Sequence, residues 1–193
     1  MKRYGCLLFL ILLCAFSATA QVFDRSTVDK EEPKLGWISL GLGAADSLFG
    51  FNVNACILVS KHCFSAQYVQ AKEILFLNFS DKPENSRYEF NLTYGRKTST
   101  NSVIALGSIG ACYMNERIYE VVGSYNDDPD DWFGFGTEYI WAARQRSYYG
   151  IIAKGQILLR TKTLGIGPSI AVSFTGERTF LSIYLDVAFG NLK

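Results

Sequence analysis

Histidine is nearly absent from this chain, and neither sign of charge dominates it. His62 is the single histidine among 193 residues, and 19 basic residues stand against 18 acidic ones. Histidine is the commonest general acid or base in enzymes, and the predicted turn beside His62 contains no acidic residue. We therefore interpret His62 as structural and expect no catalytic residue. The balanced charge and the lack of a basic cluster argue against binding to nucleic acid.

Long hydrophobic runs are also missing. No segment reaches the ~20 apolar residues that a membrane-spanning helix needs. The longest run, residues 7–16, follows Lys2 and Arg3 and precedes Ala18-Thr19-Ala20, an order typical of a signal peptide with cleavage before Gln21. A lipoprotein signal at Cys14 is the alternative, which the bulky Leu13 disfavours. We expect residues 1–20 to be the signal peptide, 21–34 a short N-terminal segment and 35–193 one domain.

Cysteine is too scarce and too irregularly spaced for a disulfide framework. Cys6 and Cys14 fall in the predicted signal peptide, which leaves Cys56, Cys63 and Cys112. An odd count at irregular spacing favours three free thiols. A bridge between Cys56 and Cys63, which flank a predicted tight turn, is the alternative.

What the chain does contain is period-two alternation of apolar and polar residues, which is typical of β-strands. The alternation predicts eight strands, at residues 35–45, 49–59, 62–71, 87–97, 102–114, 149–160, 164–174 and 180–190. Their length suits tilted membrane strands, which need ~9–11 residues. Residues 116–148 could hold a further hairpin, which would make ten strands.

The connections and the polar face distinguish two kinds of barrel. Short turns alternate with longer connections at 72–86 and 116–148, as in outer-membrane barrels, where turns are periplasmic and loops extracellular. The polar face carries mostly Ser, Gly, Asn, Thr, Gln and Ala, which suits a narrow lumen, whereas a soluble exterior would be more highly charged. The alternative, a soluble lipocalin-like ligand carrier, would have the apolar face inside.

Four stretches carry a resemblance to a known kind of protein: "GWISLGLG", "LTYGR", "LGIGPSIAVSF" and "AFGNLK". Together they make the mature chain similar to the small eight-stranded bacterial outer-membrane β-barrels of OmpA and OmpX architecture, and in particular to small barrels of Bacteroidota-type bacteria. The resemblance implies an all-β, antiparallel up-and-down barrel in the outer membrane. It also implies export through the periplasm, contact with outer-membrane lipid and insertion by the outer-membrane assembly machinery. Such barrels commonly end on an aromatic residue, whereas here Phe189 is followed by Gly190-Asn191-Leu192-Lys193.

Few charges fall on the predicted inward face of the barrel. They are Glu89, Lys154, Arg160 and Asp186. A charge away from bulk water needs a partner, and Lys154 and Asp186 are predicted at similar depth. We expect a lumenal salt-bridge network that fills the bore.

The stretch "NDDPDDWFGF" is a candidate binding loop, with Asp127, Asp128, Asp130, Asp131 and Trp132. Its carboxylates could bind calcium, but the spacing of a calcium loop is absent and Pro129 interrupts it, so we expect no metal and no cofactor. The sequence predicts a structural or adhesive role, or binding through the loops 72–86 and 116–148. An outer-membrane barrel enzyme acting on lipid or peptide is the second hypothesis.

Overall fold

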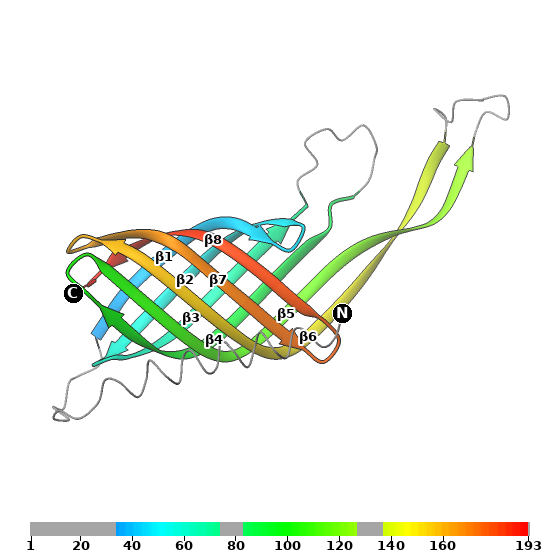
Figure 1. Ribbon diagram of the computed structural model, residues 1–193. Coiled ribbons are helices and arrows are strands. Elements are labelled where there is room, and N and C mark those ends of the chain that lie inside the picture. Colours follow the sequence, from blue (N-terminus) through cyan, green and yellow to red (C-terminus); the bar gives the residue numbers. More distant parts are fainter. Residues whose placement is uncertain (1–33, 74–82, 127–136, 193) are drawn as a thin grey trace. The chain divides into compact units, whose positions relative to one another are not determined.

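The computed structural model describes residues 34–73, 83–126 and 137–192. The predicted signal peptide and residues 21–33 lie outside this range. Eight strands form one closed antiparallel barrel, each paired with its neighbours in the chain and β1 with β8 (Figure 1). They are β1 (Lys34–Ala45), β2 (Leu48–Val59), β3 (His62–Lys72), β4 (Ser86–Ser99), β5 (Val103–Asn126), β6 (Thr137–Arg160), β7 (Leu164–Thr175) and β8 (Thr179–Gly190). No helix in the described residues is apolar and long enough to cross a bilayer.

The alternation of side chains has the predicted sense, with apolar residues outside. In β8, Leu181, Ile183 and Leu185 are exposed, whereas Ser182 and Asp186 are buried in the lumen. The same pattern recurs in β4, where buried and exposed residues alternate from Arg87 onward. A soluble carrier would need the reverse arrangement, so the lipocalin-like alternative is wrong. The outward apolar side chains form a surface suited to lipid.

The barrel has two ends that differ in their connections. The turn end carries the short connections 60–61, 100–102 and 161–163, and the loop end carries 46–47, 73–85, 127–136 and 176–178. Both the start of β1 and the end of β8 lie at the turn end, because these two strands pair from Trp37↔Gly190 to Ala45↔Ser182.

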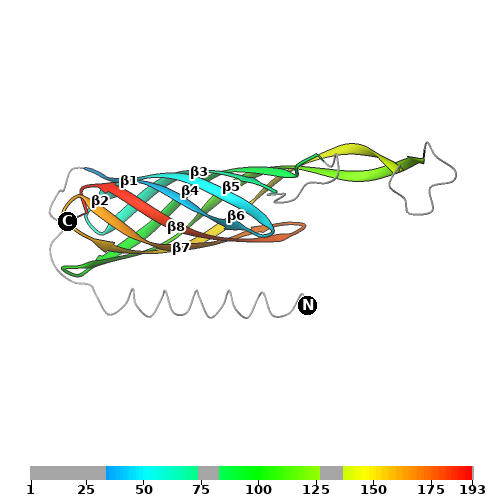
Figure 2. The same cartoon turned by 90° about the horizontal axis from the view of Figure 1, so that it is seen from above.

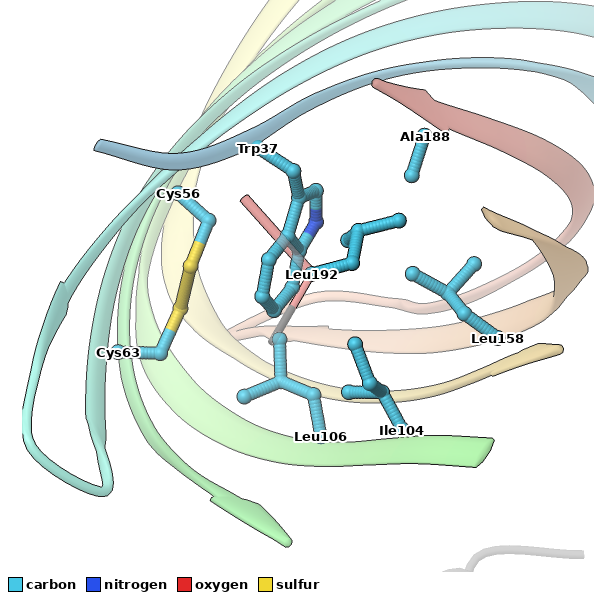
Figure 3. Close-up of a cluster of buried hydrophobic side chains, with 8 residues drawn as sticks. All are labelled: Trp37, Cys56, Cys63, Ile104, Leu106, Leu158, Ala188 and Leu192. Carbon is cyan, nitrogen blue, oxygen red and sulfur yellow. A yellow bond between two sulfur atoms is a disulfide. The ribbon is translucent and has the colours of Figure 1, made fainter. Parts of the chain in front are cut away.

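An apolar cluster, which we call the turn-end plug, closes the lumen near the turn end (Figure 3). Its buried members are Trp37, Cys56, Cys63, Ile104, Leu106, Leu158, Ala188 and Leu192. Leu192 follows Gly190, whose φ of 144° is open to glycine but rarely to other residues. This backbone conformation accompanies the turn of the chain from β8 into the bore, so the C-terminal segment contributes to the plug.

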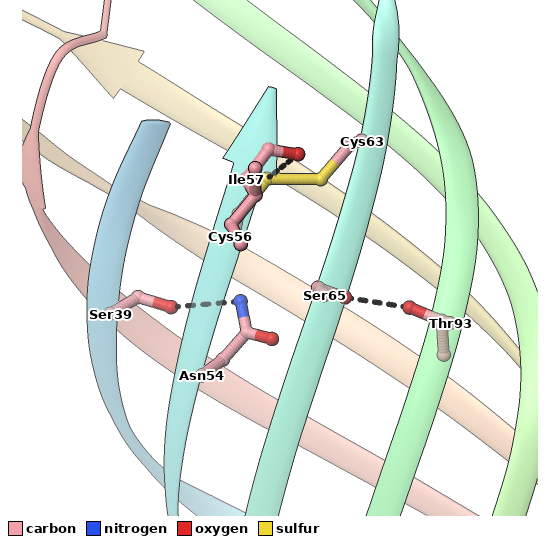
Figure 4. Close-up of a disulfide and its surroundings, with 7 residues drawn as sticks. All are labelled: Ser39, Asn54, Cys56, Ile57, Cys63, Ser65 and Thr93. Atoms are coloured by element: carbon pink, nitrogen blue, oxygen red, sulfur yellow. Dashed lines mark hydrogen bonds between the residues drawn. A yellow bond between two sulfur atoms is a disulfide. The ribbon is translucent and has the colours of Figure 1, made fainter. Parts of the chain in front are cut away.

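The cysteine prediction was wrong for two of the three thiols. Cys56 and Cys63 form a disulfide across the β2–β3 hairpin (Figure 4). Cys112 is free and buried. Leu58 faces Cys63 in the register, so even-numbered residues of β2 and odd-numbered residues of β3 share the inward face. An odd number of cysteines at irregular spacing therefore did not exclude a bridge between two of them.

The prediction of a loop at 116–148 was also wrong, and so was the ten-stranded alternative. Strands β5 and β6 are each 24 residues long, and their pairing continues to Asn126↔Thr137. β4 pairs with β5 only up to Arg117, and β7 pairs with β6 only from Gly150. Figures 1 and 2 both show β5 and β6 running on past the other strands. We call residues 118–126 and 137–149 the β5–β6 ribbon.

Candidate functional site

Asp186 lies fully buried in the middle of the lumen and is bound by two carboxamides. Its Oδ1 accepts a hydrogen bond from Asn52 Nδ2 at 3.0 Å, and its Oδ2 accepts one from Gln156 Nε2 at 2.6 Å. Gly41 lies between Asn52 and Asp186 in the register, and a Cβ there would come within 2.0 Å of Asp186 Oδ1. A glycine is therefore required where the side chains of β2 and β8 meet over β1.

The other three charges predicted for the lumen do not join Asp186 in one network. Lys154 is buried, but its Nζ has no hydrogen-bond partner among the described residues. Arg160 lies at the turn end, where its Nη2 donates to the carbonyl oxygen of Thr100 at 2.7 Å. Gln156, two residues from Lys154 on the same inward face, donates to Asp186 instead. The prediction paired Lys154 with Asp186 because the two charges lie at similar depth. It did not consider that the N–H of an amide such as Gln156 can also donate to a carboxylate.

Glu89 belongs to a second polar cluster, at the loop end. Its Oε1 lies 3.0 Å from Arg87 Nε, and Arg87 Nη1 lies 2.6 Å from Asp46 Oδ2. The guanidinium of Arg87 stands 4.8 Å from the centroid of the Phe180 ring, and that of Arg178 stands 5.0 Å from it, both within range of a cation–π interaction. The sequence argument missed Arg87, although it shares the inward parity of Glu89 on β4.

A small polar pocket opens beside this cluster, with a volume of about 150 Å³. Arg178 Nη1 lies 3.2 Å from Glu116 Oε2 on its wall, and its other lining residues are Asp46, Ser47, Leu48, Asn85, Ser86, Arg87 and Ile118. The cations and carboxylates of this pocket pair largely with one another, so no strong excess of charge is left for a ligand. Below the pocket, Met114, Tyr148 and Phe180 pack together and close the loop end of the lumen.

Metal-binding groups do not gather anywhere in the described part of the chain. No three His, Cys, Asp or Glu side chains there could hold one metal ion. His62 lies at the turn end, stacked on the ring of Tyr94, whose Oη lies 2.5 Å from His62 Nδ1. The five predicted loop residues, Asp127, Asp128, Asp130, Asp131 and Trp132, lie outside the described residues.

Toward the loop end and beyond it, the outward face of β5 and β6 changes character twice. Tyr113 and Tyr149 face each other with ring centroids 5.1 Å apart, and Tyr149 is 77% exposed, as expected of the aromatic girdle at a membrane surface. Next comes a polar band, in which Asn115 donates to Ser147 and accepts from Gln145. Aromatic residues followed by polar ones are the order expected where barrel strands leave a bilayer.

Beyond the polar band, the β5–β6 ribbon carries exposed apolar side chains. Val121 and Val122 on β5 and Tyr139 and Ile140 on β6 are each about half exposed or more, and Val122 reaches 63%. The rings of Tyr139 and Trp141 lie 6.3 Å apart. The sequence analysis placed these residues in the longer connection 116–148, because it ended the regular alternation of the preceding strand at residue 114.

No protein-family model matches the chain, and neither does any curated protein. Solved structures do. The attachment invasion locus protein Ail of Yersinia pestis aligns with a TM-score of 0.53 at 13% identity, over 82% of this chain and 98% of Ail. The N-terminal β-barrel domain of Pseudomonas aeruginosa OprF has a TM-score of 0.51 at 12% identity, over 79% and 94% of the two chains.

Neisserial surface protein A also has a TM-score of 0.51, at 11% identity, over 82% of this chain and 99% of that one. Identities this low establish the fold and nothing finer. The closed eight-stranded barrel, its apolar outer surface and these likenesses agree with the predicted architecture and with its location in the bacterial outer membrane. The chain has the fold of the small eight-stranded outer-membrane β-barrels.

Proposed function

We propose that this protein is an outer-membrane barrel with a closed lumen that binds a partner outside the cell through its β5–β6 ribbon. The observation that carries the proposal is the apolar surface of the ribbon, with Val121, Val122, Tyr139 and Ile140 exposed beyond the polar band. Exposed apolar surface is typical of an interaction site. Catalysis forms no part of the proposal.

The proposed orientation follows from the two ends of the barrel. In bacterial outer-membrane barrels the short turns face the periplasm and the longer connections face the medium. The loop end, from which the ribbon extends, would then face the medium. Insertion by the outer-membrane assembly machinery belongs to the same proposal, with the outward-facing Phe189 near the end of β8 as the terminal aromatic residue.

Transport through the bore is disfavoured by the packing inside it. The turn-end plug closes one end, and Met114, Tyr148 and Phe180 close the other. A structural or adhesive role is thus better supported than that of a pore. Ail is named for attachment and invasion, but the likeness to it supports the fold alone.

A variant that lacks the outer part of the ribbon, which we call the ribbonless variant, tests the proposal. Tyr119 and Ala143 are cross-strand partners, so residues 120–142 can be replaced by Asn-Gly, which favours a two-residue hairpin turn. Cells displaying either form are applied to surfaces coated with purified secreted and cell-surface proteins. We expect at least one surface to retain cells that display the wild-type barrel. Cells that display the ribbonless variant should bind that surface about tenfold more weakly, a difference of ~1.4 kcal/mol in binding free energy. Equal retention on every surface would refute the proposal.

A further inference from the structure

The outer edge of β6 in the ribbon is an unpaired strand edge. Residues 137–149 pair with β5 on one side, whereas β7 first pairs with β6 at Gly150↔Thr175. Within the described residues, no other strand lies along this edge. In an antiparallel pair, every second residue directs its N–H and C=O away from its partner. This edge therefore presents a row of backbone donors and acceptors to the medium.

The corresponding edge of β5 is partly occupied and irregular. Asn85 Oδ1 accepts a hydrogen bond from Tyr119 N at 2.8 Å, where the pairing with β4 ends. A bulge between Val121 and Gly123 interrupts the register, and bulges are one means by which edges are protected from pairing. The two edges of the ribbon are thus unequal, and the edge of β6 is the more open one.

Protection by charge is absent from the middle of the β6 edge. Exposed edges usually carry charged residues or proline, but residues 139–143 read Tyr-Ile-Trp-Ala-Ala. Charge returns only at Arg144 and Arg146, nearer the barrel. Arg144 is paired with Glu120 at 3.2 Å, and its side chain is still 57% exposed; Arg146 makes no ion pair with any described residue.

We infer that the β6 edge, residues 139–146, is a strand-addition site for an extended segment of a partner protein. This inference rests on the proposed function and specifies how the ribbon would bind. The segment would lie along β6 with its main chain hydrogen-bonded to the free N–H and C=O groups, as in other cases of β-augmentation. Its side chains would be apolar next to Tyr139–Trp141 and acidic next to Arg144 and Arg146, where a carboxylate complements the guanidinium groups.

The test uses the full barrel in lipid nanodiscs and short random peptides displayed on phage. We expect enriched peptides to alternate apolar residues, to lack proline, to carry acidic residues toward one end, and to bind the wild type rather than the ribbonless variant. Ala142 and Ala143 direct their N–H groups in opposite directions. One of the substitutions Ala142→Pro and Ala143→Pro therefore removes a donor from the free edge, and the other breaks a bond to β5.

Limited proteolysis shows which of the two proline variants keeps the ribbon paired, because a paired ribbon resists cleavage. That variant should bind the peptides about tenfold more weakly than the wild type does. Ala143→Glu, which adds a negative charge next to the acidic end of the bound segment, should weaken binding similarly, whereas Ser124→Glu, which adds the same charge to β5, should change it little. Peptides N-methylated at alternate residues, which cannot pair as a strand, should not bind.

Several outcomes would overturn strand addition. The first is that no peptide binds the wild type better than the ribbonless variant. The second is that N-methylated peptides bind as well as unmodified ones. The third is that peptides bind equally to the wild type and to the two edge variants, which are the proline variant that keeps the ribbon paired and the charged variant at Ala143. Dimerisation of the barrel that requires the same edge would make a second copy the occupant and would also overturn it. If deleting the ribbon abolishes cell binding while the edge variants retain it, strand addition fails but the proposed function survives.

Discussion

At the scale of single residues, the lumen is organised by amides and carboxylates as much as by ion pairs. Asp186 is bound by Asn52 and Gln156 rather than by a cation. A hydrogen bond to a charged group contributes ~1.5–3 kcal/mol, and a buried charge that loses its partners costs more. The stability of the bore should therefore depend on which side chains surround Asp186.

A double-mutant cycle tests the role of Gln156. Asp186→Ala should lower the free energy of unfolding by about 3 kcal/mol, and we expect a coupling of ~1.5–3 kcal/mol between Asp186→Ala and Gln156→Ala. The coupling of Asp186 to Lys154 should be smaller, because no ion pair joins them. Denaturant unfolding of the folded barrel in detergent measures each term. If the coupling of Asp186 to Lys154 is larger than its coupling to Gln156, a salt bridge between Lys154 and Asp186 contributes more to stability than the amide–carboxylate hydrogen bond.

Substitution at Gly41 tests the close approach over β1. Gly41→Ala puts a Cβ within 2.0 Å of Asp186 Oδ1 and 2.3 Å of Asn52 Nδ2, so the amide–carboxylate contact must shift. We expect a loss of about 1–3 kcal/mol in unfolding free energy. Gly155→Ala is the matched control, because its Cβ would meet only Ile170 Cγ2, at 3.7 Å. Equal effects of the two substitutions would contradict the account of Gly41.

At the scale of elements, neighbouring strands differ in how far they continue. β4 and β7 stop near the loop end, whereas β5 and β6 go on with only each other as partners. The ribbon continues because valine, isoleucine, tyrosine and tryptophan favour strands, even after the lipid-facing alternation has ended. The β2–β3 hairpin, by contrast, ends in a tight turn beside the disulfide.

Thiol counting checks the β2–β3 hairpin. In the chain without residues 1–20, one thiol, that of Cys112, should react with a maleimide after unfolding without reductant. Prior reduction should add the thiols of Cys56 and Cys63, which form the disulfide. Cys112→Ser provides the control and should leave no reactive thiol before reduction. Reaction of all three thiols without reduction would show that the bridge does not form.

At the scale of the whole molecule, the barrel is a filled cylinder. Apolar clusters close both ends of a polar interior, and the bore of an eight-stranded barrel is only wide enough for side chains. The apolar outer surface requires lipid or detergent, so the protein should not fractionate as a soluble monomer.

Conductance measurements check whether the lumen is closed. The wild-type barrel reconstituted into planar bilayers should show no steady, large conductance, because side chains occupy the bore. The ribbonless variant should behave in the same way, since residues 120–142, which it lacks, include no member of either cluster. A stable open pore in the wild type would contradict the closed lumen and would make the inward charges a selectivity device.

The sequence by itself determined the number of strands, their faces and most of their bounds. Alternation of apolar and polar residues is a local property of each strand. A shift of one residue would turn every side chain of that strand to the opposite face, so the alternation assigns the faces without ambiguity. The inward positions of Glu89, Lys154 and Asp186 follow from this parity. The outward apolar face follows from it as well, together with the small, uncharged residues of the opposite face.

Only the tertiary structure decided which inward residues meet. Strand register determines that Gly41 lies between Asn52 and Asp186, and that Cys56 comes within bonding distance of Cys63. Register and closure depend on pairing between strands far apart in the sequence, such as β1 with β8. For the same reason the sequence could not reveal the ribbon, because its defining property is that the neighbouring strands end where β5 and β6 continue.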